Sequence, residues 1–414
     1  MVGSPCMPAQ LYAVRLVKPL RLCVAASSLL AAGGLQAAVN AFDFQATPPL
    51  LQNSSTPRVM LLMSNDQQLY HKAYSDYSDL DGDGELDTSY NDDFDYYGYF
   101  NTQLCYSYQN QRFEPSAATV SGHQCAGDAW SGNFLNWAAM TRMDIVRRVY
   151  YGGKRIVDQD DEAVLQRTLL PTDSHAFVKV YDGADVDKYT PYNYDQISLC
   201  NVTLASGSIK DVDESASPPL LRVVDGSFPL WSATESFQCL DQSETGAGHA
   251  GDVDRPIEVA ADHDLHVRVL ACSETERKLA AADDCRAYGD GDAAVYKPAG
   301  MLQARGEDAG VRFGLMTGTH EYKMSGGVLR RNIMPIAGNA DATQDEIDLG
   351  TGRFRYLDDD VNFSGGIIET LDRMRIAYWD YDVGEYDKDP AVSNGADECD
   401  QPGIKVDDYE GNNR

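Results

Sequence analysis

Positively charged side chains are scarce in this chain of 414 residues. It has 34 Lys and Arg residues against 64 Asp and Glu residues, which gives a formal net charge of −30 at pH 7. A surface this acidic repels nucleic-acid phosphates and anionic lipid headgroups, and it attracts cations. We therefore expect no nucleic-acid partner. Disorder of the whole chain is also excluded, because 43% of the residues are hydrophobic and can supply a core.

Long hydrophobic runs are missing too, apart from one near the N-terminus. There, Arg15, Lys18 and Arg21 precede "LCVAASSLLAAGGLQAAVNA", a run of apolar and small residues with plausible cleavage points between Ala37 and Ala41. This layout is typical of a secretory signal peptide. A single membrane anchor is the alternative, because the run approaches spanning length. We predict a signal peptide over residues 1–41, export, and no membrane insertion after cleavage.

Cysteine usage fits an exported protein. Of the nine cysteines, Cys6 and Cys23 lie in the predicted leader. In an oxidising compartment the others could pair with their neighbours in sequence, although sequence does not fix the connectivity. The candidate pairs are Cys105 with Cys125, Cys200 with Cys239, and Cys272 with Cys285. Cys399 is left over, so we expect residues 381–414 to be an acidic tail of a truncated chain.

The order of hydrophobic patterns predicts an α/β fold. After a linker over residues 42–57, "RVMLLM" and the later "VRFGLM" are continuously apolar, as strands buried in a parallel sheet are. The segments "SGNFLNWAAMTRMDIVRRVYYGG" and "GGIIETLDRMRIAYW" have the spacing of amphipathic helices. Ser131 or Asn133 can cap the first helix at its start, and Gly152 can end it.

The middle of the chain has a different composition. It is rich in Asp, Ser and Gly, with short strand-like stretches between polar loops, which predicts a β-rich insertion that holds two of the disulfides. We therefore expect the α/β domain in two parts. The predicted boundaries are residues 58–152 for the first part, 153–300 for the insertion and 301–380 for the second part.

The stretch "DLDGDGELDTSYNDD", which starts at Asp79, has the spacing of a calcium loop. Calcium takes six to eight oxygen ligands, and alternate residues of a tight loop can aim theirs at one centre. Gly84 falls where such a loop turns sharply, and Leu86 falls where a side chain points inward. The predicted Ca²⁺ ligands are Asp79, Asp81, Asp83, Glu85 through its carbonyl, and Asp87.

The twelfth position of this loop departs from the pattern. Tyr90 stands where a bidentate acid is usual, so Asp92, Asp93 or an acid from elsewhere would have to replace it. No helical pattern ends at Asp79, so an EF-hand fold is not expected. The alternative is a solvated acidic turn. A second stretch, "YGDGDAAVY", matches the pattern less well and contains Asp290 and Asp292.

No active site can be recognised in the sequence. "GAGHAG" at residues 246–251 has a dinucleotide-binding spacing, but no apolar strand precedes it. "HDLH" at residues 263–266 lies in a strand-like stretch and lacks a metalloprotease glutamate. His175 has no recognisable nucleophile partner, so we interpret it as a satisfied structural histidine. We predict a protein without enzymatic activity; the alternative is a secreted, calcium-stabilised hydrolase or carbohydrate-binding protein.

Several segments resemble the N-terminal region of PilY/PilC-type pilus proteins, which are associated with the tips of type IV pili. They are "RVMLLMSNDQQLY", "YSDLDGDGELDTSY", "SGNFLNWAAMTRMDIVRRVYYGG", "YKPAGMLQARGE", "VRFGLMTGTHEYKMSGGVLRRNI" and "GGIIETLDRMR", in that order. The resemblance implies a role in pilus biogenesis or tip adhesion, at the periplasm, cell surface or pilus tip. The implied partners are pilus components or a receptor on a host or other surface.

The resemblance also implies a fold and a second metal position. The fold is a von Willebrand factor A-like, doubly wound α/β sheet with insertions, which family members continue into a C-terminal β-propeller. Such domains often bind a metal directly after the first strand, where this chain has only Ser64 and Asp66. Two ligands are too few for a divalent ion. The following tyrosine-rich run either contacts a partner or covers the sheet; its residues are Tyr90, Tyr96, Tyr97 and Tyr99.

Overall fold

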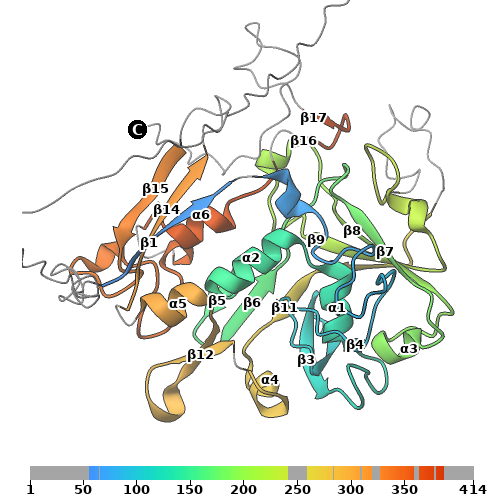
Figure 1. Cartoon of the computed structure of the whole chain (residues 1–414), viewed down its shortest axis with the longest axis horizontal. Helices are drawn as coiled ribbons and strands as arrows, with labels where there is room; N and C mark the ends of the chain where they lie inside the picture. The colour runs from blue at the N-terminus through green and yellow to red at the C-terminus, as the bar shows by residue number, and fades with distance from the viewer. Residues whose placement is uncertain are drawn as a thin grey trace, which may run out of the picture. The chain divides into compact units, whose positions relative to one another are not determined.

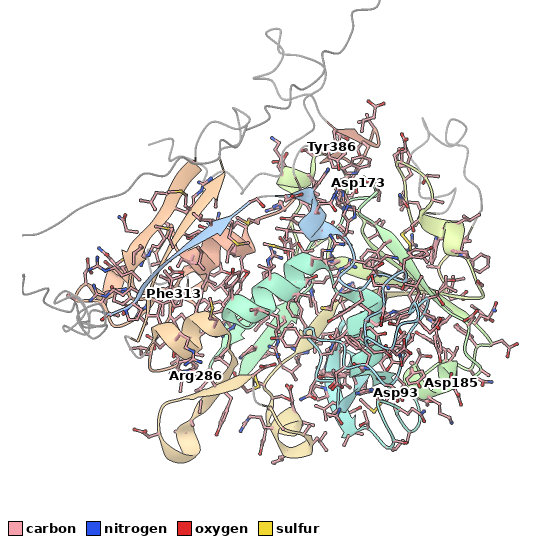
Figure 2. All side chains as sticks on the ribbon, viewed as in Figure 1. Asp93, Asp173, Asp185, Arg286, Phe313 and Tyr386 are labelled. Atoms are coloured by element: carbon pink, nitrogen blue, oxygen red, sulfur yellow. A yellow bond between two sulfur atoms is a disulfide. The ribbon has the colours of Figure 1, made fainter. Side chains whose placement is uncertain are left out.

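The two apolar strands predicted at opposite ends of the chain pair with each other. In the computed structural model, β1 (Arg58–Met63) runs parallel to β14 (Arg312–Gly318), and Leu61 lies opposite Leu315. An antiparallel strand, β15 (Gly327–Met334), completes a sheet in the order β1-β14-β15 (Figure 1). Phe313 of β14 is buried in this part of the protein (Figure 2). The prediction of a parallel pair is confirmed. The expectation that β1 is buried is wrong for most of the strand, because β1 lies at the edge of the sheet: only Leu61 is buried, and Leu62 is 72% exposed. The described sheet is also smaller than a doubly wound one.

The structure describes residues 56–64, 66–240, 259–282, 284–307, 310–318, 327–358, 363–376 and 379–386. They belong to one compact unit that begins at Thr56. The predicted signal peptide, most of the linker, the segment "GAGHAG" and Cys399 lie outside the described residues. Within them, no helix is both long and apolar enough to cross a membrane.

Two further sheets form most of the unit. One is antiparallel, in the order β10-β9-β8-β7, and the other has the order β4-β2-β3-β11-β6-β5. In the second sheet, β3 pairs with β11 from far along the chain, so strands from both sides of residue 153 share it. The first sheet contains β7 (Phe177–Tyr181), β8 (Ile197–Thr203), β9 (Pro219–Asp225) and β10 (His263–His266).

The strands of the second sheet are short. They are β2 (Leu104–Gln109), β3 (Arg112–Ala118), β4 (Trp130–Ser131), β5 (Arg155–Gln159), β6 (Glu162–Gln166) and β11 (Arg268–Leu270). Two hairpins pair β12 (Cys285–Tyr288) with β13 (Val295–Pro298), and β16 (Trp379–Asp380) with β17 (Glu385–Tyr386). The fold is therefore a mixed α/β arrangement of several sheets.

The long helix predicted after Ser131 is two helices. α1 (Gly132–Ala139) begins with the Ser131 side chain accepting from the Phe134 amide, and α2 (Arg142–Tyr151) ends at Gly152 with φ +89°, both as predicted. The helix breaks because Thr141 caps α2: its side chain accepts from the Asp144 amide, and the Asp144 side chain accepts from the Thr141 amide. This reciprocal pair satisfies donors at a new N-terminus.

The remaining helices are short. They are α3 (Val186–Tyr189), α4 (Glu274–Leu279), α5 (Met301–Gly306) and α6 (Ile367–Asp372), with 3₁₀ turns η3 (Gln67–Tyr70), η4 (Ile209–Asp211), η5 (Pro229–Ser232), η6 (Gly291–Ala293), η7 (Ala342–Gln344) and η8 (Arg355–Leu357). α5 contacts β14 and α6 contacts β15, so both predicted apolar strands are held in an α/β unit.

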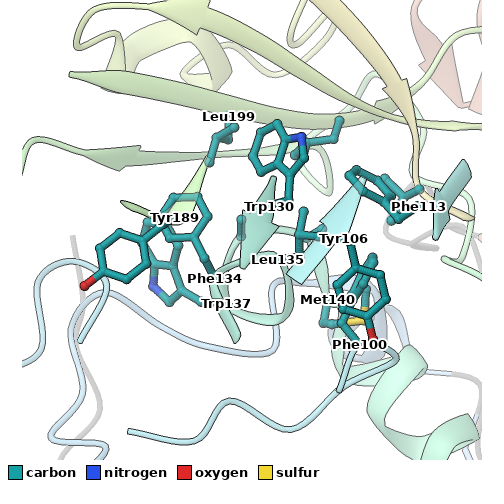
Figure 3. Packing of buried hydrophobic residues seen from close by; sticks show 14 of the residues in the cluster. Phe100, Tyr106, Phe113, Trp130, Phe134, Leu135, Trp137, Met140, Tyr189 and Leu199 are labelled. Carbon is teal, nitrogen blue, oxygen red and sulfur yellow. The ribbon is translucent and has the colours of Figure 1, made fainter. Parts of the chain in front are cut away.

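α1 lies inside an aromatic core and is buried on all sides (Figure 3). Its Phe134 packs against rings from β7, α3 and the segment before β2, and its Trp137 packs against Tyr90 of that segment. In that segment the exposed fractions of Tyr90, Tyr96 and Tyr99 are 8%, 0% and 3%. Three of the four tyrosines therefore cover the core, which was one of the two interpretations of the run, whereas Tyr97 is 41% exposed.

Three disulfides confirm the predicted pairs. Their Cα–Cα distances are 5.8 Å, 5.9 Å and 5.5 Å, within the usual range, for Cys105–Cys125, Cys200–Cys239 and Cys272–Cys285 respectively. The first closes the connection after β3, and the other two lie within residues 153–300, as expected.

Candidate functional site

The acidic stretch after Asp79 folds into a closed turn on the surface. The Asp87 amide donates to the Ser78 carbonyl at 3.0 Å, which joins the two ends of the turn. Gly82 and Gly84 have φ of +81° and +95°, a backbone conformation that glycine adopts at little cost. The sharp turn predicted at Gly84 is present.

Three of the predicted ligands converge within this turn. Oxygen atoms of Asp79, Asp81 and Asp87 all lie within 4.8 Å of one another. Backbone amides hold two of these carboxylates: Gly82 and Gly84 donate to Asp79 at 2.6 Å and 3.0 Å, and Leu80 donates to Asp87 at 2.7 Å. The cluster is thus shaped by the turn itself.

Asp83 and Glu85 are exposed, as are Asp79 and Asp81. The Asp83 carboxylate accepts from the Glu85 amide at 2.8 Å and is not part of the group of three. The inward side chain expected for Leu86 is wrong, since 61% of that side chain is exposed. The physical reason is the antiparallel bridge between Ser78 and Asp87: Asp87 points toward the cluster, so its neighbour points away.

Asn91 connects the cluster to the aromatic core. Its Nδ2 donates to Asp81 at 2.9 Å and to Asp87 at 3.1 Å, while its backbone amide donates to the buried Tyr96 hydroxyl at 3.1 Å. Sequence reasoning missed this residue. The sequence did contain a clue: Asn91 directly follows Tyr90, which occupies the twelfth position of the loop, where the pattern requires a ligand.

The two acids offered as replacements at the twelfth position have other contacts. Asp92 accepts from the Tyr90 hydroxyl at 3.0 Å and from the His123 amide at 3.2 Å. Burial raises the pKa of Tyr90, so its hydroxyl stays protonated and able to donate. The exposed Asp93 has its backbone amide bonded to the Asn91 side chain at 3.0 Å.

Two asparagines of α1 fix the segment that follows the turn. The Asn133 side chain donates to the Tyr90 hydroxyl and the Phe94 carbonyl, and it accepts from the Tyr96 amide at 2.8 Å. Asn136 donates to the Tyr96 and Phe100 carbonyls at 2.7 Å and 2.8 Å and accepts from the Phe100 amide at 3.1 Å. A buried irregular segment thereby satisfies its backbone groups.

The charge of the cluster is unbalanced. The ion pairs of neighbouring residues in sequence, Lys72 with Asp76 and His123 with Asp92 and Asp95, do not include it. Among the described residues, Asp79, Asp81 and Asp87 form no ion pair. Three hard oxygen donors without a positive partner suit a hard cation such as Ca²⁺.

The other two metal positions considered from sequence have fewer donors. The Asp66 carboxylate accepts from the Gln68 amide at 2.9 Å and caps η3, so it is engaged by the backbone. Asp290 is exposed and precedes η6, with no side-chain cap bond. Neither belongs to a group of three converging ligands among the described residues.

Two family models match the chain. One, the small alpha/beta domain of PilY1 homologs, matches residues 87–224, and the other, their second domain, matches residues 313–403. A Xylella fastidiosa (strain Temecula1) protein named type IV pilus biogenesis factor PilY1 homolog is 31% identical over 345 residues, which cover 78% of this chain and 22% of the relative. A second protein of that name and strain is 26% identical over 259 residues, which cover 57% and 18%.

These matches confirm the resemblance drawn from the sequence. The chain spans about a fifth of the length of these relatives, whose names describe biogenesis factors and not enzymes. No solved structure gives a significant match. With two family models and both relatives in agreement, the chain belongs to the PilY1 homolog family of type IV pilus factors.

Proposed function

We propose that this chain acts in type IV pilus biogenesis as an exported protein without enzymatic activity, and that its Asp-rich turn binds Ca²⁺. The names of the relatives support the pilus role. Three disulfides support export, since they persist in oxidising compartments. The partners would be pilus components or a receptor on a host or other surface.

The observation that carries the calcium proposal is the convergence of three unpaired carboxylates. Asp79, Asp81 and Asp87 would hold the ion, and the Glu85 carbonyl and water would supply further oxygens. The ion would neutralise charges that otherwise repel one another across less than 4.8 Å. Asp83 would contribute as an additional negative charge at the rim.

Bound calcium would stabilise the folded state of this protein. An ion that binds only the folded turn lowers the free energy of the folded state. Asn91 joins the turn to Tyr96, and α1 holds the segment from Tyr90 to Phe100. Occupancy of the turn would therefore fix the connection between β1 and the aromatic core.

We also propose that the parallel pair β1–β14 belongs to a von Willebrand factor A-like domain. The pairing of distant parallel strands and the contacts of α5 and α6 with this sheet support that fold. The metal position usual after the first strand would be inactive, because the Asp66 carboxylate caps η3.

The function can be tested by gene replacement in the source bacterium. Deletion should reduce surface pili, counted after shearing. The full-length gene with Asp79→Asn, Asp81→Asn and Asp87→Asn should restore fewer pili than wild type. The control variant removes the same charge from exposed positions and should restore normal numbers; it carries Asp160→Asn, Asp161→Asn and Asp195→Asn.

The outcomes separate the two parts of the proposal. Unchanged pili after deletion would contradict the pilus role. Full restoration by the loop variant, with a clear defect in the deletion strain, would leave the pilus role standing and reject the calcium role.

A further inference from the structure

Three aromatic rings stack on one another at the edge of the sheet β10-β9-β8-β7. The stretch "HDLH" forms β10, an edge strand, and begins with His263. The Tyr192 ring lies parallel to the His263 ring, with centroids 4.7 Å apart and planes 10° apart. It also lies parallel to the Tyr194 ring, with centroids 5.1 Å apart and planes 9° apart. We call these three rings the aromatic stack.

The stack is joined to the core through its middle ring and is open at its ends. Trp130, which is 1% exposed, meets the Tyr192 ring edge-on at 5.5 Å. Tyr194 is partly exposed and His263 is exposed. Among the described residues, neither of these two rings contacts a ring other than Tyr192, and no Lys or Arg side chain lies over them. Each therefore keeps an aromatic face that another molecule can reach.

Two carboxylates without a cation lie beside the stack. Asp225 ends β9 and Asp262 precedes β10, and the Asp225 amide donates to the Asp262 carboxylate at 2.9 Å. Both residues are exposed, and neither forms an ion pair with a described residue. Burial raises the pKa of Tyr194, and the nearby charges of Asp262 and Asp225 raise it further. The neighbouring Asp264, in contrast, is balanced by Arg222 at 2.9 Å.

The same combination of ring and carboxylate holds a cation elsewhere in this chain. Arg155 Cζ lies 3.7 Å from the centroid of the Phe354 ring, and the guanidinium donates to Asp158 at 3.0 Å. The Lys179 ammonium lies 4.7 Å from the Trp137 centroid, and it too pairs with a carboxylate. The ring quadrupole attracts the cation, and the carboxylate adds a charge-assisted hydrogen bond. At the aromatic stack the ring and the carboxylates are present, and no described residue supplies the cation.

We propose that the aromatic stack, with Asp225 and Asp262, is a docking surface for a basic segment of a partner protein. An arginine or lysine side chain of that segment would lie against the open face of Tyr194 and donate to the two carboxylates. The net charge of −30 would draw such a segment toward the chain. Tyrosine rings suit this role, because they supply contact area at a low cost in conformational entropy. The proposal depends neither on the calcium proposal nor on the pilus role.

Titration with a basic peptide tests the surface in the chain itself. The probe is a short peptide of alternating arginine and glycine, blocked at both ends, and calorimetry measures its Kd. We expect Tyr194→Ala to weaken binding about 2- to 30-fold, as the loss of one cation–π contact does. Tyr194→Phe keeps the aromatic face and should bind like wild type. Asp225→Asn with Asp262→Asn should also weaken binding, with a smaller effect at high salt, because salt screens exposed charges.

Controls separate this surface from the charge of the whole chain. Tyr77 is 78% exposed and already has Lys72 over its ring, so Tyr77→Ala should bind the peptide like wild type. Asp160→Asn with Asp161→Asn removes the same charge from exposed positions and should also bind like wild type. A peptide with citrulline in place of arginine keeps the shape without the charge, and it should bind much more weakly than the arginine peptide.

Nuclear magnetic resonance with labelled tyrosine and histidine shows where the peptide binds. The ring signals of Tyr194 and His263 should shift on addition of the arginine peptide, and the signals of Tyr77 should not. Absence of binding in wild type, equal affinity for the citrulline peptide, or wild-type affinity in both Tyr194→Ala and the Asp225 and Asp262 variant would overturn the proposal. Tighter binding of a neutral oligosaccharide at the same rings would also overturn it, because that ligand needs no cation.

Discussion

The asparagines of α1 give the sharpest test of how the core holds the segment after the acidic turn. Asn136 is fully buried, and its side chain makes three hydrogen bonds to the backbone of Tyr96 and Phe100. Asn136→Ala removes all three and leaves two carbonyls and one amide without partners. The substitution also leaves a small void in the buried position.

The cost can be estimated from the groups left unpaired. Each buried polar group without a partner costs about 1–3 kcal/mol, and neighbouring losses are not additive. We therefore expect Asn136→Ala to lower the free energy of unfolding by about 3 kcal/mol or more, which is large for one substitution. Gly98→Ala should act on the same contact, since an added Cβ would lie 2.2 Å from Asn136 Oδ1.

Urea unfolding followed by tryptophan fluorescence measures this cost, because Trp130 and Trp137 lie in the same cluster. The control is Asn193→Ala at an exposed position, where a change within about 0.5 kcal/mol is expected. A loss below about 1 kcal/mol for Asn136→Ala would refute the account of α1 as the support of this segment.

Two further predictions concern a buried charge and a disulfide. Burial lowers the pKa of Lys179 to about 8 from 10.5, against the opposing effect of Asp76. Because the unfolded state then binds more protons between these values, stability should rise with pH from about 8 to 10.5, relative to Lys179→Met. A difference in unfolding free energy between wild type and Lys179→Met that stays constant across that pH range would contradict this prediction. Replacing Cys200 and Cys239 by Ala opens a loop with a sequence separation of 39 and should cost about 4 kcal/mol in urea unfolding. An unchanged free energy of unfolding would show that this disulfide does not stabilise the folded protein.

The elements that follow from local patterns were predicted correctly. The apolar strands β1 and β14, the Ser131 cap, the Gly152 end of α2 and the three disulfide pairs all follow from residue type and spacing. Each depends on a few neighbouring residues, or on cysteines that are close in sequence. One tight turn also brings together the carboxylates of three predicted ligands, Asp79, Asp81 and Asp87, while Asp83 lies outside this group; calcium binding by them stays a prediction.

What the sequence did not reveal includes one local feature, and the rest depends on contacts between distant segments. The break between α1 and α2 comes from a local cap at Thr141 that interrupts an otherwise continuous apolar pattern. The pairing of β3 with β11 joins strands that no periodicity connects. The His71 and His175 rings stack on each other although the two residues lie far apart in sequence, so neither histidine could be assigned a neighbour beforehand.

Calcium binding to the acidic turn is the central claim, and titration calorimetry combined with thermal melts tests it most directly. The wild-type chain should bind one Ca²⁺ and gain about 2.7 kcal/mol of stability at a free concentration of 100 times Kd. Asp81→Asn with Asp87→Asn should lose both effects, and Asp160→Asn with Asp161→Asn should keep them. Absence of binding in wild type, or equal binding in the Asp81 and Asp87 variant, would contradict the account.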